Sequence, residues 1–269
     1  NLGLENNILK NYQATLKASE GIILVTGPTG SGKTTTLYAG LRYLSDASQN
    51  ILTVEDPIEY TLKGVGQTQV NPKTGYDFAM GLRSMLRQDP DVVMVGEIRD
   101  QETARIAIQA SLTGHLVLST VHTNSAVGAI TRLRDMGIEP FLLSSSLKTI
   151  ISQRLVRRLC RHCKQENRLA GSMAGLFDIK TGTTVFGPKG CDHCDGTGYV
   201  GRIAVAESIQ IDAKLKNMIH EKASEQELAK YAFQHTLSID EAGKDLIISG
   251  ITSAEELIRI NNQKDDASL

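Results

Sequence analysis

The sequence predicts an α/β fold with a parallel-rich central sheet, and three observations support this prediction. Short apolar runs alternate with helical segments over residues 22–121, as in parallel sheets that helices cover on both faces. A glycine-rich loop at residues 27–34 joins the first run to a helix. Each later run ends in a polar cluster, so we expect ligands to bind at the carboxyl edge of the sheet.

The loop at residues 27–34 reads Gly-Pro-Thr-Gly-Ser-Gly-Lys-Thr, and its place between strand and helix is that of a phosphate-binding loop. Its glycines let backbone N–H groups approach phosphate oxygens, and the helix N-terminus attracts negative charge. Lys33 is expected to reach the β- and γ-phosphates, and Thr34 to bind Mg²⁺. A turn that binds nothing is the alternative, but it would not need the Gly-Lys-Thr ending. The predicted nucleotide-binding residues are Gly27, Pro28, Thr29, Gly30, Ser31, Gly32, Lys33, Thr34 and Thr35.

Glu97 follows the apolar run at residues 92–95. We predict that it positions and polarises the attacking water, because phosphoryl transfer depends on orientation and charge stabilisation. Gly96 stands where an aspartate that helps to hold Mg²⁺ is expected, so the metal would need carboxylates from elsewhere.

An acidic cluster of Glu55, Asp56 and Glu59 follows the run at residues 51–54. These carboxylates could order the water shell of the metal, since Mg²⁺ keeps several of its waters. A solvated loop with a turn at Asp56 is the alternative reading of the same residues.

Two histidines flank the run at residues 116–121. His122 follows it and is a candidate to hydrogen-bond the γ-phosphate, although a purely structural histidine is the alternative. His115 precedes the run and is expected at the opposite end of the strand, and its role stays open.

The four cysteines form two Cys-x-x-Cys pairs, Cys160 with Cys163 and Cys191 with Cys194. In a reducing compartment such pairs indicate a structural four-sulfur Zn²⁺ site. The segment at 164–190 is longer than is usual between such pairs, so we expect a small subdomain there. Redox chemistry is the alternative, but nothing in the sequence resembles a thioredoxin context.

The chain is expected to divide into three segments. Residues 1–157 form the ATPase core, which begins with an amphipathic helix, and residues 158–200 form the tetracysteine subdomain. Residues 201–269 form a mostly helical segment, in which Ser224 with Glu227, and Thr252 with Glu255, predict capping boxes.

The composition excludes other classes of protein. The 269-residue chain has a net charge of -1 and only 4% aromatic residues without Trp, which argues against a nucleic-acid surface. No apolar run approaches the roughly 18 residues of a membrane span, and no signal peptide opens the chain. We therefore expect a soluble, cytosolic protein. The chain begins at Asn1 rather than Met, which favours a fragment or a processed product.

Several of these motifs together resemble the ATPases of type II secretion and type IV pili. The resemblance rests on the loop at 27–34, the acidic box at 53–60, the arginine-rich run at 82–91, the Gly-Glu-Ile-Arg-Asp segment at 96–100 and the histidine box at 113–124. They follow one another in the order that the family has. The fold implied is that of a RecA-like P-loop NTPase.

Within the family, the chain is most similar to the type II secretion branch. The segment at 134–146 resembles that branch, whereas pilus retraction motors lack the cysteine pairs. Pilus assembly ATPases share the pairs and are the alternative.

The resemblance also implies a homo-hexamer with arginines that reach the phosphates. Arg83, Arg87 and Arg99 match the arginines of the family, and Arg202 is a further nucleotide-binding candidate. A transition-state arginine is worth roughly 10³–10⁵ in rate. Arg83 and Arg87 could instead only pair with nearby carboxylates.

The partners implied belong to an inner-membrane secretion platform, including the cytoplasmic domain of a GspL-type subunit. Members of the family reach this platform through an upstream region that also supplies arginines to the site, and they lie peripherally on the inner membrane. Because the chain lacks such a region, we expect it to bind ATP but to hydrolyse it slowly.

The predicted function is ATP hydrolysis that drives protein export. Two rivals come from other classes, a nucleic-acid motor on the same fold and a non-catalytic nucleotide switch. The absence of a basic stripe argues against the first.

Overall fold

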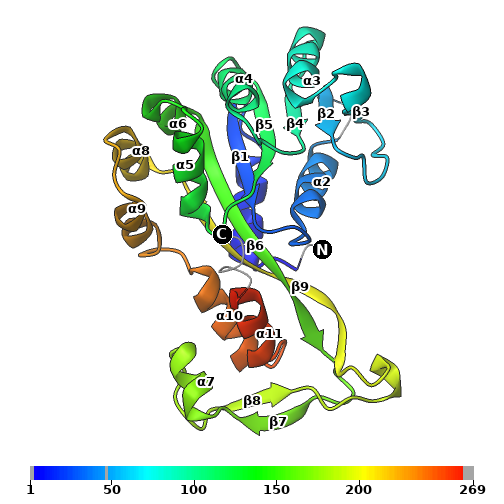
Figure 1. The fold of residues 1–269 in the computed structure, drawn as a ribbon, viewed down its shortest axis with the longest axis vertical. Coiled ribbons are helices and arrows are strands. Elements are labelled where there is room, and N and C mark those ends of the chain that lie inside the picture. Colours follow the sequence, from blue (N-terminus) through cyan, green and yellow to red (C-terminus); the bar gives the residue numbers. More distant parts are fainter. Residues whose placement is uncertain (1–2, 46–47, 263–269) are drawn as a thin grey trace.

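The structure is a computed structural model that describes residues 3–45 and 48–262. Within these ranges a seven-stranded sheet forms the centre of the molecule, in the order β3-β2-β4-β5-β1-β6-β9 (Figure 1). The first six strands are parallel, and β9 is antiparallel to β6. The predicted parallel-rich α/β fold is therefore confirmed. The strands are β1 (Gly21–Thr26), β2 (Ile51–Glu55), β3 (Gly66–Gln69), β4 (Val92–Val95), β5 (Leu116–Val121), β6 (Leu147–Leu159) and β9 (Tyr199–Gln210).

Helices cover both faces of the sheet, because successive strand residues point to opposite sides. In β1, Ile22 and Leu24 pack into one apolar core, whereas Ile23 and Val25 pack into the other. The first core is covered by α3 (Phe78–Met85), α4 (Gln101–Leu112), α5 (Ala126–Asp135), α6 (Pro140–Ser146), α8 (Ala213–His220) and α9 (Glu225–Ala232). The second core is covered by α1 (Asn6–Thr15) and α2 (Lys33–Leu44). Short 3₁₀ turns are η1 (Pro72–Thr74), η2 (Leu86–Gln88) and η3 (Asp192–Cys194).

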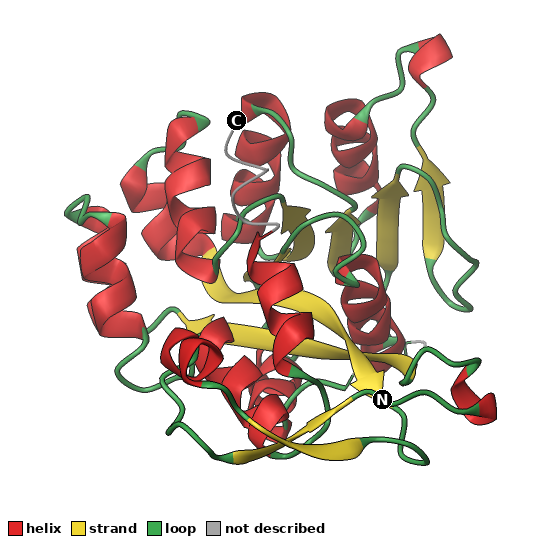
Figure 2. Cartoon of the chain, turned by 60° about the horizontal axis from the view of Figure 1, so that its bottom comes forward, coloured by secondary structure: helices red, strands yellow, loops and turns green. Residues whose placement is uncertain are grey.

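The tetracysteine segment lies between the end of β6 and the start of β9, the two longest strands of the sheet. β6 and β9 pair from Thr149 with Gln210 to Leu159 with Tyr199, and they lead out of the core to a small hairpin (Figures 1 and 2). This hairpin consists of β7 (Gln165–Arg168) and β8 (Thr184–Gly187), with α7 (Gly171–Leu176) between them. Because β9 belongs to the central sheet, the helical part of the C-terminal segment starts after it. The division into three segments stays a prediction.

The last two helices, α10 (Ile239–Ile248) and α11 (Ala254–Asn262), pack in a separate apolar cluster with the hairpin and with β6 and β9. A third apolar cluster joins Phe177 and Val185 of the insertion to Ile247 and Leu257. Among the helices of the described ranges, none combines the length and the apolar run that a membrane span requires.

One of the two predicted capping boxes is confirmed. Ser224 and Glu227 cap α9 reciprocally, but the expected pair of Thr252 and Glu255 is wrong. Thr252 donates its hydroxyl proton to the carbonyl oxygen of Arg157 instead, at 2.9 Å. Ser253 caps α11, since its Oγ accepts the N–H of the residue three positions on, at 3.4 Å. A tertiary contact with β6 thus competes for the threonine and shifts the cap by one residue.

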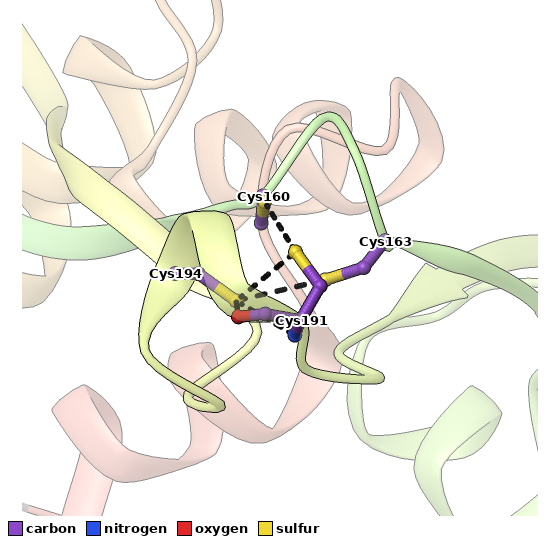
Figure 3. A group of neighbouring side chains, drawn as sticks. All are labelled: Cys160, Cys163, Cys191 and Cys194. Atoms are coloured by element: carbon purple, nitrogen blue, oxygen red, sulfur yellow. Dashed lines mark hydrogen bonds between the residues drawn. The ribbon is translucent and has the colours of Figure 1, made fainter.

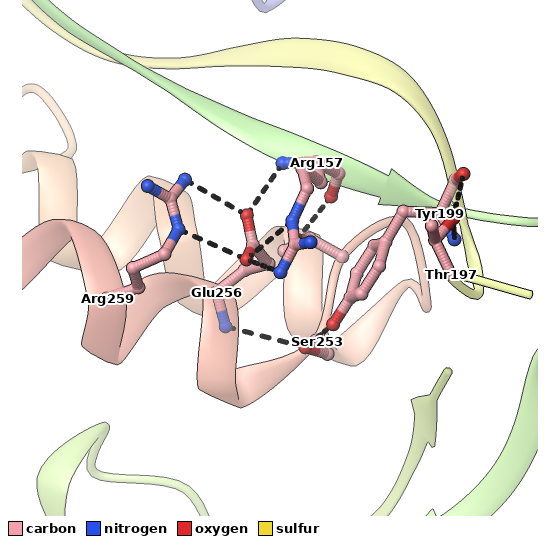
Figure 4. Close-up of polar contacts among 7 residues, drawn as sticks. Arg157, Thr197, Tyr199, Ser253, Glu256 and Arg259 are labelled. Atoms are coloured by element: carbon pink, nitrogen blue, oxygen red, sulfur yellow. Dashed lines mark hydrogen bonds and ion pairs between the residues drawn. The ribbon is translucent and has the colours of Figure 1, made fainter. Parts of the chain in front are cut away.

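A buried carboxylate fastens α11 to β6 (Figure 4). Glu256 is 1% exposed and accepts hydrogen bonds from Arg157, with Oε1 to Nη2 at 2.6 Å and Oε2 to the backbone N at 3.0 Å. Arg259 adds a bond of 3.1 Å to Oε2. The Arg157 guanidinium also lies over the Tyr199 ring, 4.2 Å from its centroid. Burial raises the pKa of Glu256, but the hydrogen bonds from the arginines outweigh it and lower the pKa to about 2.

Glu256→Gln should therefore lower the free energy of unfolding by about 2–3 kcal/mol at pH 7. A depressed pKa stabilises the fold fully above the ordinary value of 4.5, and that contribution is lost as the pH falls through about 2. Urea unfolding of parent and variant should give a difference that is constant at neutral pH and shrinks toward pH 2. Glu255→Gln, on the exposed side of the same helix, is the control. A difference that does not change with pH would contradict the prediction.

Candidate active site

The phosphate-binding loop lies between β1 and α2, as predicted. Gly27 has φ +142°, and a Cβ at this position would come within 2.4 Å of the carbonyl oxygen of Gln153. Gly32, with φ +88°, is the N-cap residue of α2 and has no side chain that could accept the N–H groups of the first turn. The first N–H groups of α2 therefore face the loop without a capping side chain, which is the arrangement that binds anions.

Lys33 begins α2 and folds over this loop. Its Nζ donates to the carbonyl oxygens of Gly27 at 2.9 Å and Pro28 at 3.1 Å. Burial lowers the pKa of Lys33, the Glu97 carboxylate opposes this effect and the Arg154 guanidinium adds to it. Lys33 and Glu97 therefore influence each other electrostatically, and both line one pocket although they follow different strands.

The carboxyl ends of four parallel strands surround a pocket of about 580 Å³. These ends lie at one edge of the sheet, because the register pairs Thr26 with Val121 and Val54 with Val95. Most of the predicted site residues line this pocket. They are Thr29, Gly30, Gly32, Lys33, Thr34, Thr35, Glu55, Asp56, Glu59, Glu97, Arg99, His122 and Arg202. Gly27, Pro28 and Ser31 belong to the same loop but lie beside the pocket.

Glu97 lies at the centre of a charged cluster in the pocket. Its carboxylate accepts a hydrogen bond from Arg99 Nε at 2.6 Å, and its other oxygen lies 3.1 Å from Nε2 of His122. Arg99 also lies 3.7 Å from Asp56. The sequence separates these residues by up to 66 positions, and the ends of β2, β4 and β5 bring them together.

Glu55 is 2% exposed, and three side chains hold its carboxylate in place. Thr53 donates to Oε1 at 2.6 Å, Gln67 donates to the same oxygen at 3.0 Å, and the hydroxyl of Tyr38 donates to Oε2. Sequence reasoning did not identify Tyr38 or Gln67. The sequence does not distinguish these two residues, because a single tyrosine in a helix or a glutamine in a short strand is common outside active sites.

Two of the four predicted arginines lie outside the pocket. Arg83 forms an exposed ion pair with Glu102 of α4, and Arg87 contacts the hydroxyl of Ser84 at 3.4 Å. Exposed pairs of this kind contribute little to stability. Of the four predicted arginines, Arg99 and Arg202 line the pocket.

His115 lies at the opposite end of β5 from His122, as expected. Its Nδ1 is 3.0 Å from the carbonyl oxygen of Ala110. It therefore contacts the end of α4 and not the pocket.

Gln153 is a buried residue of β6 that the sequence analysis missed. Its side-chain amide donates to the carbonyl oxygen of Ser31 at 2.8 Å, and its Oε1 accepts from the Thr36 hydroxyl at 2.8 Å. Gln153 therefore braces the phosphate-binding loop against the first turn of α2. The only signal in the sequence is a polar side chain inside an apolar run.

The four cysteines come together at the end of β6 and β9 (Figure 3). Their sulfur atoms lie within 4.8 Å of one another, with Cys160 to Cys191 at 3.9 Å and Cys163 to Cys194 at 3.7 Å. A tetrahedral metal with bonds of about 2.3 Å places its sulfur ligands about 3.8 Å apart. The N–H groups of Cys191 and Gly198 also donate to the sulfur of Cys194. This donor set fits one tetrahedral metal ion, and it groups four sulfurs rather than two separate redox pairs.

Comparison with known proteins agrees with this geometry. Residues 1–259 match the family model described as Type II/IV secretion system protein. The chain is 54% identical over 264 residues to the Type II secretion system ATPase E of Vibrio cholerae and 52% identical over 262 residues to the Type II secretion system protein E of Klebsiella pneumoniae. These alignments cover 97% of this chain but 52% and 53% of the relatives. The chain thus spans about half the length of the curated relatives it matches.

Solved structures with similar folds include a pilus retraction motor and a bacterial ATPase. The pilus retraction motor PilT with bound ADP has a TM-score of 0.72 and 31% identity, over 96% of this chain and 65% of that one. The Legionella pneumophila ATPase DotB has a TM-score of 0.70 and 25% identity, over 97% of this chain and 64% of that one.

The charged groups around His122 lead to a prediction about its pKa. Burial lowers its pKa from 6.5, Lys33 lowers it further, Glu97 raises it and Arg99 lowers it again. Glu97→Gln should therefore shift the pKa of His122 further down, because it removes the carboxylate that favours the imidazolium. An NMR titration of the imidazole C–H signals measures this shift. Arg83→Gln, outside the pocket, should leave the titration unchanged, and an upward shift in Glu97→Gln would disprove the assignment.

Proposed function

Because the chain belongs to the Type II/IV secretion system protein family, we propose that it is the ATPase part of a motor that drives protein export by type II secretion. One observation carries this proposal. Lys33 and Glu97 line a single pocket, although they are 64 residues apart in the chain. The two residues follow β1 and β4, which lie on either side of β5 in the sheet. A lysine that faces the phosphates and a carboxylate that orients the attacking water are two of the parts that nucleotide hydrolysis uses.

The proposed reaction is in-line attack of water on the γ-phosphate of ATP. Glu97 aligns and polarises the water, and Lys33 stabilises the charge that develops on the phosphate. Thr34 is the proposed direct ligand of Mg²⁺, which would neutralise phosphate charge when bound. Asp56 and Glu59 are exposed at the pocket and are suited to holding waters around such an ion, whereas the carboxylate of Glu55 is already engaged by three donors.

Two residues of the proposed mechanism, Arg83 and Arg87, act from outside this pocket. Both are exposed on the α3 side of the molecule, and we assign them to a neighbouring subunit's site in a homo-hexamer.

Two residues of the pocket are assigned to the γ-phosphate. His122 would respond to the γ-phosphate, because its ring lies beside Glu97. Arg99 would exchange its bond to Glu97 for the phosphate.

The proposed partners are the inner-membrane platform proteins, including a GspL-type cytoplasmic domain, and the proposed location is the cytoplasmic face of the inner membrane.

Pilus assembly is the second candidate function, which the structural likeness to a pilus motor supports. A nucleic-acid motor and a non-catalytic switch are the rivals from other classes. Salt-dependent DNA binding would favour the former.

Glu97→Gln and Lys33→Ala should separate the chemical step from binding. Glu97→Gln should retain ATP affinity and lose at least about a hundredfold in turnover, because water is no longer oriented. Lys33→Ala should weaken nucleotide binding itself, because the cation that faces the phosphates is gone. Phosphate release and calorimetric nucleotide binding measure the two effects.

Turnover of Glu97→Gln at the parent rate would refute the assigned role. Persistent lack of turnover in an assembled hexamer that includes the upstream region would favour the switch.

We also propose that the four cysteines hold one structural Zn²⁺. Structural zinc contributes on the order of 10–16 kcal/mol of apparent binding free energy, so chelation should remove the metal and loosen residues 160–199. Elemental analysis and amide hydrogen exchange measure these effects. The exchange of β1 and α2 should stay at parent levels, since they belong to another core. Chelation that leaves zinc content and local exchange unchanged would contradict the proposal.

A further inference from the structure

Glu207 is a buried carboxylate in β9 that joins the N-termini of two helices. It is 2% exposed. Its Oε1 accepts the N–H of Ala126, the first residue of α5, at 2.7 Å. Its Oε2 accepts the N–H of Ile239, the first residue of α10, at 2.9 Å. Burying a carboxylate costs desolvation free energy. Charge-assisted hydrogen bonds and the positive ends of two helix dipoles offset this cost at Glu207.

One of these helices leads directly from the candidate active site. α5 begins four residues after His122, and the intervening loop is also held by Arg154, whose Nη2 donates to the carbonyl oxygen of Asn124 at 2.8 Å. Burial lowers the pKa of Arg154, and the nearby Glu207 carboxylate opposes this effect. Arg154 and Glu207 thus hold the His122 loop from two sides.

The other helix, α10, packs against the β7–β8 hairpin, which lies in sequence between the two cysteine pairs. Ile239 and Ile247 of α10 pack in the same apolar cluster as Phe177 and Val185 of the insertion. Lys244 adds a hydrogen bond from α10 to the carbonyl oxygen of Asp178 at 2.5 Å. In Figure 1, α10 and α11 lie between the hairpin and the central sheet. Glu207 is therefore a direct polar link between the active-site loop and the C-terminal helices.

We propose that Glu207 is a positioning residue for hydrolysis, which holds the first turn of α5, and hence the His122 loop, at a set distance from α10. This inference rests on the proposed ATPase function. A carboxylate suits the task because each of its oxygens accepts one N–H, whereas a glutamine accepts only one of the two bonds. Movement of α10 and the insertion would then reach the catalytic loop through this side chain.

Glu207→Gln should lower kcat by about tenfold to a hundredfold, because a small misplacement of a catalytic group has an effect of this size. The KM for ATP should stay within about twofold, since the phosphate-binding loop is braced by Gln153 and not by Glu207. Steady-state phosphate release at several ATP concentrations separates the two parameters. A purely structural role would instead lower the amount of folded enzyme and leave kcat per folded chain unchanged.

A second pair of variants tests the link from the side of α10. Ile239→Pro removes the N–H that Glu207 accepts, at a first helical position where proline is favoured. Ser238 before it is extended, with φ −68° and ψ 163°, as proline requires. Ile239→Ala shortens the same side chain but keeps the N–H. Ile239→Pro should reproduce the loss of kcat, and Ile239→Ala should lower the melting temperature with kcat unchanged.

Glu241→Gln is the control for loss of a carboxylate at the same helix end. Glu241 accepts the N–H of Ser238 at 2.8 Å in a capping box and lies on α10 alone. This variant should lower the melting temperature without a change in kcat.

Three outcomes would overturn the inference. Parent kcat in folded Glu207→Gln or, if that variant does not fold, in Ile239→Pro would remove the link from catalysis. An equal loss of kcat in Ile239→Ala would assign the effect to packing. The variants are compared in the assembled hexamer that includes the upstream region. A parent hexamer that releases no phosphate from ATP would refute the proposed function and the role of Glu207 with it, whereas an active parent with unaffected variants would refute the role of Glu207 alone.

Discussion

The parallel pairing of β1 with β5 on one side and β6 on the other is the constraint on which the site depends. The register places Thr26 opposite Val121 and opposite Ser152. The phosphate-binding loop, the His122 loop and Gln153 therefore follow at the same level of the sheet. A shift of one residue in either pairing would turn the side chains of that strand to the opposite face. Both faces of β1 are packed into cores, so such a shift would be strongly unfavourable.

Polar residues within the buried strands form hydrogen bonds to the loops at this edge. Gln153, Arg154 and Glu207 lie on β6 and β9, and each must find partners because water does not reach it. Their partners are backbone groups of the phosphate-binding loop, the His122 loop and α10. The same two strands continue outward to the cysteines, so one pair of strands connects the candidate active site to the four-cysteine cluster.

The candidate site divides into residues that the sequence could reveal and residues that it could not. Lys33 and Thr34 lie in a contiguous motif whose function follows from local geometry. Glu97 and His122 could be placed because apolar runs mark where buried strands end. Gln153 and Glu207 were not predicted. The sequence around a polar residue does not show whether that residue is exposed or is buried and holds a loop. Arg83 lies on the exposed face of α3 and pairs with Glu102 of a separate helix, an arrangement that the sequence does not reveal.

The sequence alone determined the α/β fold, the phosphate-binding loop, the paired cysteines and the cap of α9 at Ser224, because each depends on contacts between residues close in the chain or on simple periodicity. The tertiary structure decided which distant residues meet. It placed β9 antiparallel beside β6, moved the cap of α11 from Thr252 to Ser253, and brought Glu207 to the ends of two helices. These outcomes depend on competition among partners more than 80 residues apart, and no local pattern encodes the result of that competition.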